Sequence, residues 1–281
     1  MLETEHTFLS DAPTASAGGH DSAGSDLVAS IVGRCRDTRA LIGRCEPLEV
    51  HVVHQSRKNL KKIRAGIKLL SDADGLDLVE ANRLCRDVGR LLSELRDTDV
   101  CLLTLEGIDP GLAYFGDLAE KLRSRRVDLH DDRLPDDAAY SEIVADLQAV
   151  EAILGDIDHG HIGREDLERA LRKTRKRARK RYARMDAGGN PHAYHDFRKA
   201  TKRELYQARY LGADPQPGGR LEQLDRLGEC LGHNQDLIVL KQMARELGAF
   251  DDRLAALIED ERSTVRAECR RLAADLYGRD R

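Results

Sequence analysis

The chain has 281 residues, of which 34% are charged and only 4% aromatic, with no tryptophan. No apolar run approaches the roughly 18 residues that a membrane-spanning helix needs, so a membrane partner is not expected. The formal net charge of −4 hides a segregation of charge, because residues 1–24 alone carry four acidic side chains and no basic one.

The first 24 residues are predicted to form a disordered acidic tail. They lack the basic start and the apolar centre of a secretory signal. Their stretch at residues 12–19, A-P-T-A-S-A-G-G, has the small and polar composition of segments that cannot build a core.

Helical periodicity begins near residue 26, and no later run alternates as a half-buried strand would. Breaks fall at glycine and proline, with Pro47 and Pro191 in the first turn of a predicted helix, where proline removes no internal hydrogen bond. We therefore predict an all-α chain. The expected helices lie near residues 26–43, 48–71, 76–96, 98–106, 112–129, 138–157, 164–186, 191–211, 219–232, 236–248 and 251–276.

The helix predicted near residues 48–71 carries a basic cassette, H-Q-S-R-K-N-L-K-K, at residues 54–62. At 100° per residue its cations share one arc, and Leu60, Ile63 and Ile67 lie opposite. The cationic row is about 21 Å long at 1.5 Å per residue. Like charges at this spacing destabilise a helix, so an uninterrupted row favours a polyanion ligand. The candidate binding residues are His54, Arg57, Lys58, Lys61, Arg64 and Lys68.

A second basic helix is predicted at residues 164–186. Residues 172–184 contain nine Lys or Arg side chains and no acid. An apolar stripe with Leu167 and Leu171 predicts one face for the core and one for solvent or ligand. If this helix borders the same groove as the cassette, it adds the candidate residues Arg172, Arg175, Lys176 and Arg179.

The cassette recurs 141 residues later, as H-D-F-R-K-A-T-K-R at residues 195–203. The second copy supplies His195, Arg198, Lys199, Lys202 and Arg209. A second repeated element, residues 95–100 and 232–237, follows each copy. This repetition predicts two pseudosymmetric antiparallel four-helix bundles, residues 25–135 and 136–281, around a basic central cavity or groove.

Several polar residues near the repeats have more than one interpretation. Asp97, Asp99, Asn234 and Asp236 are expected at helix starts, where they would cap free N–H groups, and orienting a nearby Arg or Lys is the alternative. His51 with His54, and His192 with His195, are spaced to hold a metal, to hydrogen-bond phosphate or to pack. The basic surroundings disfavour a metal. The six scattered cysteines are expected to be buried apolar residues in a reducing cytoplasm.

The doubled H-x-x-R-K-x-x-K cassette, with its following R-D-x-D-V or G-x-x-x-D-L element, resembles the CHAD domain family over residues 26–276. The resemblance implies two helical bundles around a basic cavity that binds inorganic polyphosphate. It also implies a cytoplasmic protein associated with polyphosphate granules and their proteins. Members commonly place Arg before the tyrosine of the second cassette. Here Leu205 precedes Tyr206, so one contact that the resemblance implies is either missing or supplied by Arg203.

Other functions are weaker predictions. A nucleic-acid binder would need aromatic stacking platforms or a reader motif, and the chain is poor in both. A metal-storing or phosphate-processing accessory protein is the third possibility. We find no phosphate-cradling glycine loop or nucleophile elbow, so no catalytic residue and no cofactor are predicted.

Overall fold

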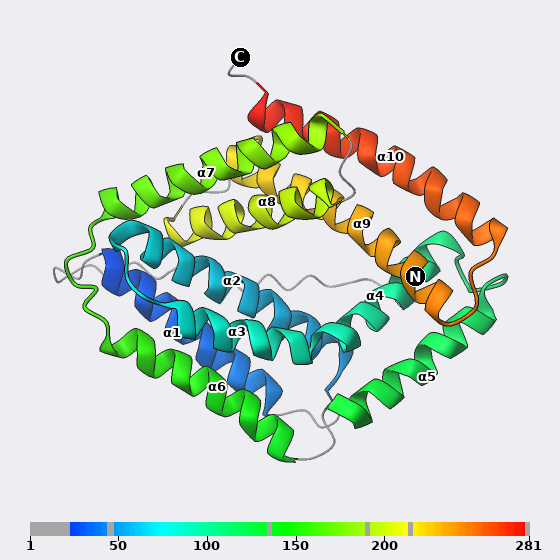
Figure 1. Ribbon diagram of the computed structural model, residues 1–281, viewed down its shortest axis with the longest axis horizontal. Coiled ribbons are helices and arrows are strands. Elements are labelled where there is room, and N and C mark those ends of the chain that lie inside the picture. The colour runs from blue at the N-terminus through cyan, green and yellow to red at the C-terminus, as the bar shows by residue number, and fades with distance from the viewer. Residues whose placement is uncertain (1–22, 44–47, 134–136, 189–191, 213–215, 279–281) are drawn as a thin grey trace.

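The structure, a computed structural model, describes residues 23–43, 48–133, 137–188, 192–212 and 216–278 (Figure 1). These residues form ten α-helices and no strand, which confirms the all-α prediction. The predicted acidic tail lies outside the described residues up to residue 22, as do Pro47 and Pro191. The helices are α1 (Ala23–Ile42), α2 (Val50–Asp74), α3 (Val79–Leu91), α4 (Ser93–Ile108), α5 (Gly116–Arg133), α6 (Asp137–Asp156), α7 (Arg164–Asp186), α8 (Ala193–Tyr210), α9 (Arg220–Glu246) and α10 (Asp252–Tyr277).

Two helix boundaries differ from the prediction. The break expected at Asp97 lies at Leu92, and the break expected between residues 232 and 236 is absent from the described α9, which continues to Glu246. This polar segment of α9 stays helical because it is packed into the interior. Gly232 and Asn234 are buried, and so are Leu231 and Leu237 on either side of them in the sequence. Tertiary packing therefore overrides the weak local helix preference of these residues.

The first apolar core joins α1, α2, α3 and α6, and it includes Ile31, Ile63 and Leu147. Close packing of α1 on α2 depends on Gly66, where a Cβ would lie 2.7 Å from Ile31 Cδ1. Because α6 belongs to the predicted C-terminal bundle but packs on α1 and α3, the packing crosses the expected boundary at residues 135 and 136. The division into two pseudosymmetric bundles therefore stays a prediction.

Two further cores share α9 and α10. One lies between α7, α8, the first half of α9 and the second half of α10, and it contains the mutually packed rings of Tyr182, Phe197 and Tyr277. The other joins α4 and α5 to the second half of α9 and the first half of α10. These shared helices tie the second core to the third.

The two cassette helices, α2 and α8, pack against each other, and α7 packs against both (Figure 1). Further along, α4 packs against α9. The basic faces of α2 and α8 are thereby brought to one region of the molecule. Over the ranges that the structure describes, no helix is both long and apolar enough to cross a bilayer.

Candidate functional site

Cations from three helices meet around Lys61 of α2. Its charged neighbours are Arg57 of the same helix, Arg96 of α4, and Arg198 and Lys202 of α8. We call these five residues the central cation cluster. Burial, and then repulsion by these four cations, lowers the pKa of Lys61 to about 7. The two cassettes therefore face each other, as the sequence repeat predicts.

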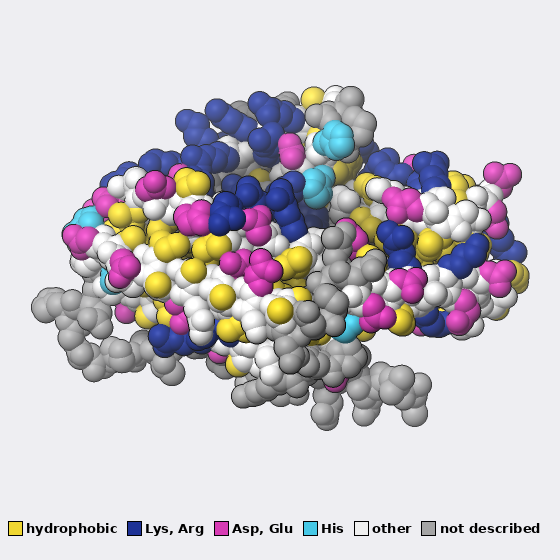
Figure 2. All heavy atoms as spheres, turned by 60° about the horizontal axis from the view of Figure 1, so that its bottom comes forward, with side chains coloured by type: hydrophobic (Ala, Val, Ile, Leu, Met, Phe, Trp, Pro, Cys, Tyr) yellow, Lys and Arg dark blue, Asp and Glu magenta, His cyan; other side chains and the backbone are white. Residues whose placement is uncertain are grey.

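The central cation cluster lies on a concave surface. The Lys61 side chain is exposed to solvent, yet protein surrounds it closely enough for burial to be the largest cause of its lowered pKa. A group that is both crowded and accessible lies in a hollow. Figure 2 shows Lys and Arg side chains gathered in a hollow near the middle of one face, with a His side chain beside them.

Hydrogen bonds hold Arg57 and Arg96 of the cluster in place. Arg57 Nη1 donates to the carbonyl oxygen of Gly89 and to Ser93 Oγ, the latter at 2.7 Å. Arg96 donates to Asp236 Oδ1 of α9 at 3.2 Å. The Nε groups of Arg57 and Arg198 are buried with no hydrogen-bond partner among the described residues. Both arginines therefore have an unused donor, and Arg57 is in addition held by Gly89 and Ser93.

Lys202 reaches the cluster across a gap in the surface of α9. A Cβ at Gly228 would lie 2.6 Å from Lys202 Cε, so only glycine leaves room for this side chain in its present position. The Lys202 ammonium group donates to Asp225 Oδ1 at 3.4 Å, and Arg209 donates to Asp225 Oδ2 at 2.7 Å. Arg209 is therefore close to Lys202 but already paired.

The surroundings of both cassette histidines lower their pKa and so favour the neutral imidazole. Burial, followed by the charges of Arg96, Lys61 and Lys58, lowers the pKa of His54. Burial and the neighbouring Lys199 lower the pKa of His195, whose Nδ1 lies 3.0 Å from Gln235 Oε1. Lys58 and Lys199 are themselves exposed at the edge of the cluster.

A pocket of about 160 Å³ extends the cluster between α2 and α3. Arg64 lines it and donates from Nε to Asn82 Oδ1 at 2.9 Å. Arg86 and Arg90 of α3, neither of them predicted from the sequence, line it as well. In the sequence, the one feature that could have pointed to these two arginines is their i,i+4 spacing on the helix after the first cassette. The acidic Asp87 between them makes this helix face look like an ordinary mixed-charge surface.

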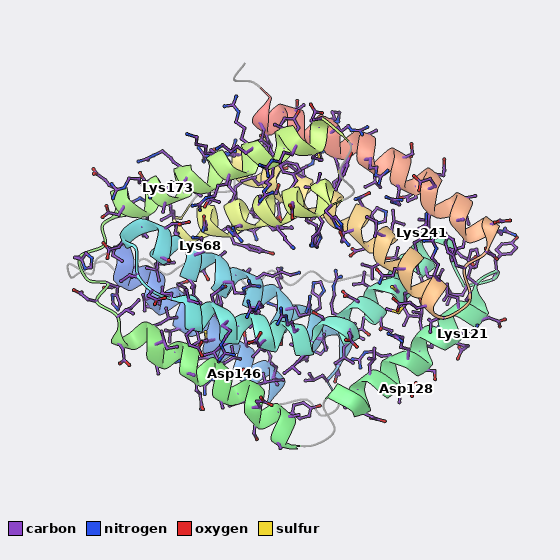
Figure 3. All side chains as sticks on the ribbon, in the orientation of Figure 1. Lys68, Lys121, Asp128, Asp146, Lys173 and Lys241 are labelled. Carbon is purple, nitrogen blue, oxygen red and sulfur yellow. The ribbon has the colours of Figure 1, made fainter. Side chains whose placement is uncertain are left out.

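Two predicted residues lie at the periphery instead. Lys68 donates to Asp72 Oδ1 at 2.7 Å, and Asp72 also accepts from Arg177 at 2.6 Å. Lys173 of α7 donates to the Asp72 carbonyl oxygen at 3.1 Å, which places it at the same end of α2 as Lys68 (Figure 3). The exposed Arg203 is near Arg177 and Asp72, so it belongs to this end of the surface.

The expectation that α7 borders the same groove is not met at Arg172 and Arg175. Arg175 Nε donates to Glu204 Oε1 at 3.3 Å, and Glu204 lies about 160° around α8 from Lys202 at 100° per residue. Arg172 and Arg175 line a different pocket, with Leu221. Arg172 and Arg175 therefore lie on that other side of α8. For Lys176 and Arg179, contact with the groove stays a prediction.

The prediction that the polar residues of the second repeated element cap helix starts is wrong. Asp97 and Asp99 lie inside α4, and Asn234 and Asp236 lie inside α9, so their backbone N–H groups are within helices. The alternative, orienting a basic side chain, fits Asp236, which pairs with Arg96, and also Asp99, which accepts from Arg126 at 2.8 Å. His51 lies 3.1 Å from Glu49, outside the cluster.

Comparison with known proteins agrees with this arrangement of helices. The family model described as "CHAD domain" matches residues 36–245, which is most of the chain. The chain belongs to the CHAD domain family. CHAD domains are linked in general to polyphosphate-type ligands.

Two solved structures share the fold of this CHAD domain. A CHAD domain from the plant Ricinus communis is 23% identical, with a TM-score of 0.64, and the alignment covers 95% of this chain and 94% of that one. PptA from Streptomyces chartreusis is 16% identical, with a TM-score of 0.66, covering 91% of this chain and 99% of that one. No curated protein matches the chain. At these identities the structural likeness establishes the fold alone.

The central cation cluster gives this CHAD domain a surface suited to anionic oxygens. Its arginines offer planar, two-pronged donors, and its lysines offer compact charges. Three carboxylates touch it at its borders, Asp97 and Asp236 through Arg96 and Asp225 through Lys202, and among the described residues none of them pairs with Lys61. The cluster therefore presents several positively charged hydrogen-bond donors at one surface.

Proposed function

We propose that this CHAD domain binds inorganic polyphosphate along the central cation cluster and the adjoining α2–α3 pocket, without transforming it. The observation that carries the proposal is the position of Lys61, which faces Arg57, Arg96, Arg198 and Lys202 from both cassettes. Bringing five cations together costs free energy in the free protein. The negative charge of a bound polyanion would offset the repulsion between these cations.

An extended phosphate chain matches the shape of the cationic surface. The row from His54 to Arg64 rises about 15 Å along α2 at 1.5 Å per residue. It continues into the α2–α3 pocket, where Arg86 and Arg90 line the opposite wall. Binding along this row would release condensed counterions, so affinity should fall steeply with salt.

The candidate contacts divide into two sets by position. The inner set consists of His54, Arg57, Lys61, Arg64, Arg96, Arg198 and Lys202. At the edge are Lys58, His195, Lys199, Arg203, Arg209 and Lys68. Arg172 and Arg175 of α7 are excluded from the proposed site because they lie on the other side of α8, where Arg175 is engaged by Glu204.

A nucleic acid is the second candidate ligand, since it presents the same phosphate oxygens. Tyr206 lies close enough to Arg198 for that charge to affect its pKa, but it is only 7% exposed, so its ring offers no stacking platform for a base. Polyphosphate is therefore the better match.

The test is calorimetric titration of the purified chain with long-chain polyphosphate at two salt concentrations. Salt-sensitive binding at low ionic strength supports the proposal, and absence of binding rejects it. Competition with duplex DNA and RNA for labelled polyphosphate ranks the ligands. Release of orthophosphate during incubation would show that the protein processes the chain.

Association with polyphosphate granules in the cytoplasm, together with granule proteins, is the cellular extension of this proposal. It requires affinity for long chains at cellular salt. Fluorescent fusions of the wild type should co-localise with granules, and fusions carrying Lys61→Glu and Arg198→Glu should disperse. Dispersed wild-type protein in cells that contain granules would reject this extension.

A further inference from the structure

A second pocket, distinct from the proposed site, lies where α7, α8 and α9 meet. It has a volume of about 340 Å³. Its floor is apolar, formed by Leu171, Ala208, Leu211, Leu221 and Leu224. Its rim carries Arg164, Arg172, Arg175 and Arg220, with Glu168 as the single acid. We call it the arginine-rimmed pocket. An apolar floor under a cationic rim suits a peptide that carries both apolar and acidic side chains.

The rim is held in place by the fold. Arg164 donates from Nη2 to the Leu211 carbonyl oxygen at 2.8 Å and from Nε to Glu168 at 3.0 Å. Arg175 and Arg220 both donate to the fully buried Glu204. Arg172 is exposed. Three of the four guanidinium groups are therefore held beside the floor by hydrogen bonds, and Arg172 adds an exposed fourth.

The chain enters the described structure beside this pocket. At the start of α1, the Gly24 N–H donates to the Ile162 carbonyl oxygen at 3.0 Å. Gly24 is pressed against this loop, because a Cβ there would lie 2.4 Å from the His159 carbonyl oxygen. Arg164, on the pocket rim, is two residues beyond Ile162. The described part of the chain therefore begins next to the arginine-rimmed pocket.

The sequence of residues 1–22 complements the pocket. Its first eleven residues, M-L-E-T-E-H-T-F-L-S-D, combine three acids with Leu2, Phe8 and Leu9 and contain no Lys or Arg. The sixteen residues from Phe8 to Gly24 can span roughly 50 Å when extended, which is ample for a pocket next to the tether. A short tether also gives an effective concentration on the order of millimolar.

We propose that residues 1–11 bind in the arginine-rimmed pocket of their own chain, with Phe8 and Leu9 on the apolar floor and the carboxylates of Glu3, Glu5 and Asp11 at the arginine rim. The central cation cluster offers the same charge but lies on the other side of α8, and Leu60 is the only large apolar side chain lining its pocket. This inference does not depend on polyphosphate binding.

Photo-crosslinking in the full-length chain tests the proposal. A photoreactive phenylalanine analogue replaces Phe8, and the crosslinked peptides are identified by mass spectrometry. We expect intramolecular crosslinks to the peptides that contain Leu171, Leu221 or Leu224. Arg172→Glu should reduce their yield at least fivefold, whereas Arg271→Glu, an exposed reversal on α10, should leave the yield unchanged.

Other outcomes overturn the proposal. Crosslinks to the central faces of α2 and α8 would place the segment on the central cation cluster, and crosslinked dimers would place it on a second copy. An absence of crosslinks, or a yield insensitive to Arg172→Glu, would equally reject it. None of these results bears on calorimetric binding of polyphosphate, so the two proposals fail independently.

Discussion

At the residue scale, Lys61 shows how the fold makes a site out of a repeat. Its ammonium group has Arg57 on the same helix and Arg198 and Lys202 on the facing one. A single cassette on an isolated helix would leave these charges in water, where they repel weakly. Facing cassettes place them in a hollow, where burial and repulsion together move the pKa of Lys61 to about 7.

The lowered pKa predicts how stability depends on pH. Between the folded pKa of about 7 and the ordinary value of 10.5, the unfolded chain binds more protons at Lys61 than the folded chain does. The free energy of unfolding should therefore rise with pH across this window. In thermal melts, Lys61→Gln should be more stable than wild type near pH 6, and the gap should narrow toward pH 10. A constant gap would contradict the lowered pKa.

Glu204 illustrates a charged residue with a structural role. It is fully buried and accepts hydrogen bonds from Arg175, Arg220 and the Tyr277 hydroxyl group, the last at 2.8 Å. Glu204→Ala should lower the free energy of unfolding by about 1–3 kcal/mol, because the Tyr277 hydroxyl group loses its buried partner. Urea unfolding measures this loss. Polyphosphate affinity should persist, and its loss in folded protein would show that this side of α8 takes part in binding.

At the element scale, α9 is shaped to let α8 present its cations. Gly228 and Gly232 lie one turn apart, against Lys202 and Arg198. A Cβ would lie 2.6 Å from Lys202 Cε at Gly228, but 3.7 Å from Arg198 Nε at Gly232, which is an ordinary contact. The two positions therefore form a matched pair of sites for substitution.

Gly228→Ala should separate binding from stability. The clash involves the far end of a flexible side chain, so the lysine can move, and alanine favours the helix by about 1 kcal/mol. Thermal stability should be equal or higher, while the displaced ammonium group weakens polyphosphate affinity by about threefold to tenfold. Gly232→Ala is the control and should bind as wild type does. Equal affinity in both variants would show that the position of Lys202 is unimportant.

Helical periodicity was sufficient to predict the all-α class, since apolar stripes such as Ile63 and Ile67 are local in sequence. It failed at residues 232–236, because Gly232 and Asn234 resemble a turn until their burial is known. It also misassigned Arg175. In a sequence, a row of basic residues on one helix face has the same pattern whether it faces solvent, a ligand or a buried carboxylate. The pairing of Arg175 with Glu204 depends on how α7 packs on α8, which the sequence pattern does not show.

At the scale of the whole molecule, the site depends on contacts between distant parts of the chain. The Arg96–Asp236 pair joins α4 to α9 across 140 residues of sequence. The repeat predicted that two cationic rows meet, but Arg86 and Arg90 could be placed beside them only from the packing of α3 on α2. Ligand contact by all these residues is still a prediction.

Binding should couple to protonation. Above pH 7 the free protein holds Lys61 largely neutral, and His54 and His195 also have lowered pKa values. Bound phosphate oxygens favour the charged forms, so complex formation at pH 8 should take up protons. Calorimetry in buffers of different ionisation enthalpy measures this uptake, which Lys61→Met should reduce. Binding without proton uptake would mean that the ligand does not contact Lys61.

Charge reversal in each cassette tests most directly whether the two halves form one site. Lys61→Glu and Lys202→Glu are compared, singly and together, with the exposed reversals Arg123→Glu and Arg271→Glu, which change net charge equally away from the cluster. In calorimetric titrations with polyphosphate, each cluster variant alone should weaken binding at least tenfold, while the controls approach wild-type affinity. If each cluster variant instead removed half of the binding stoichiometry and left the remaining affinity intact, the cassettes would be separate sites and the central claim would be wrong.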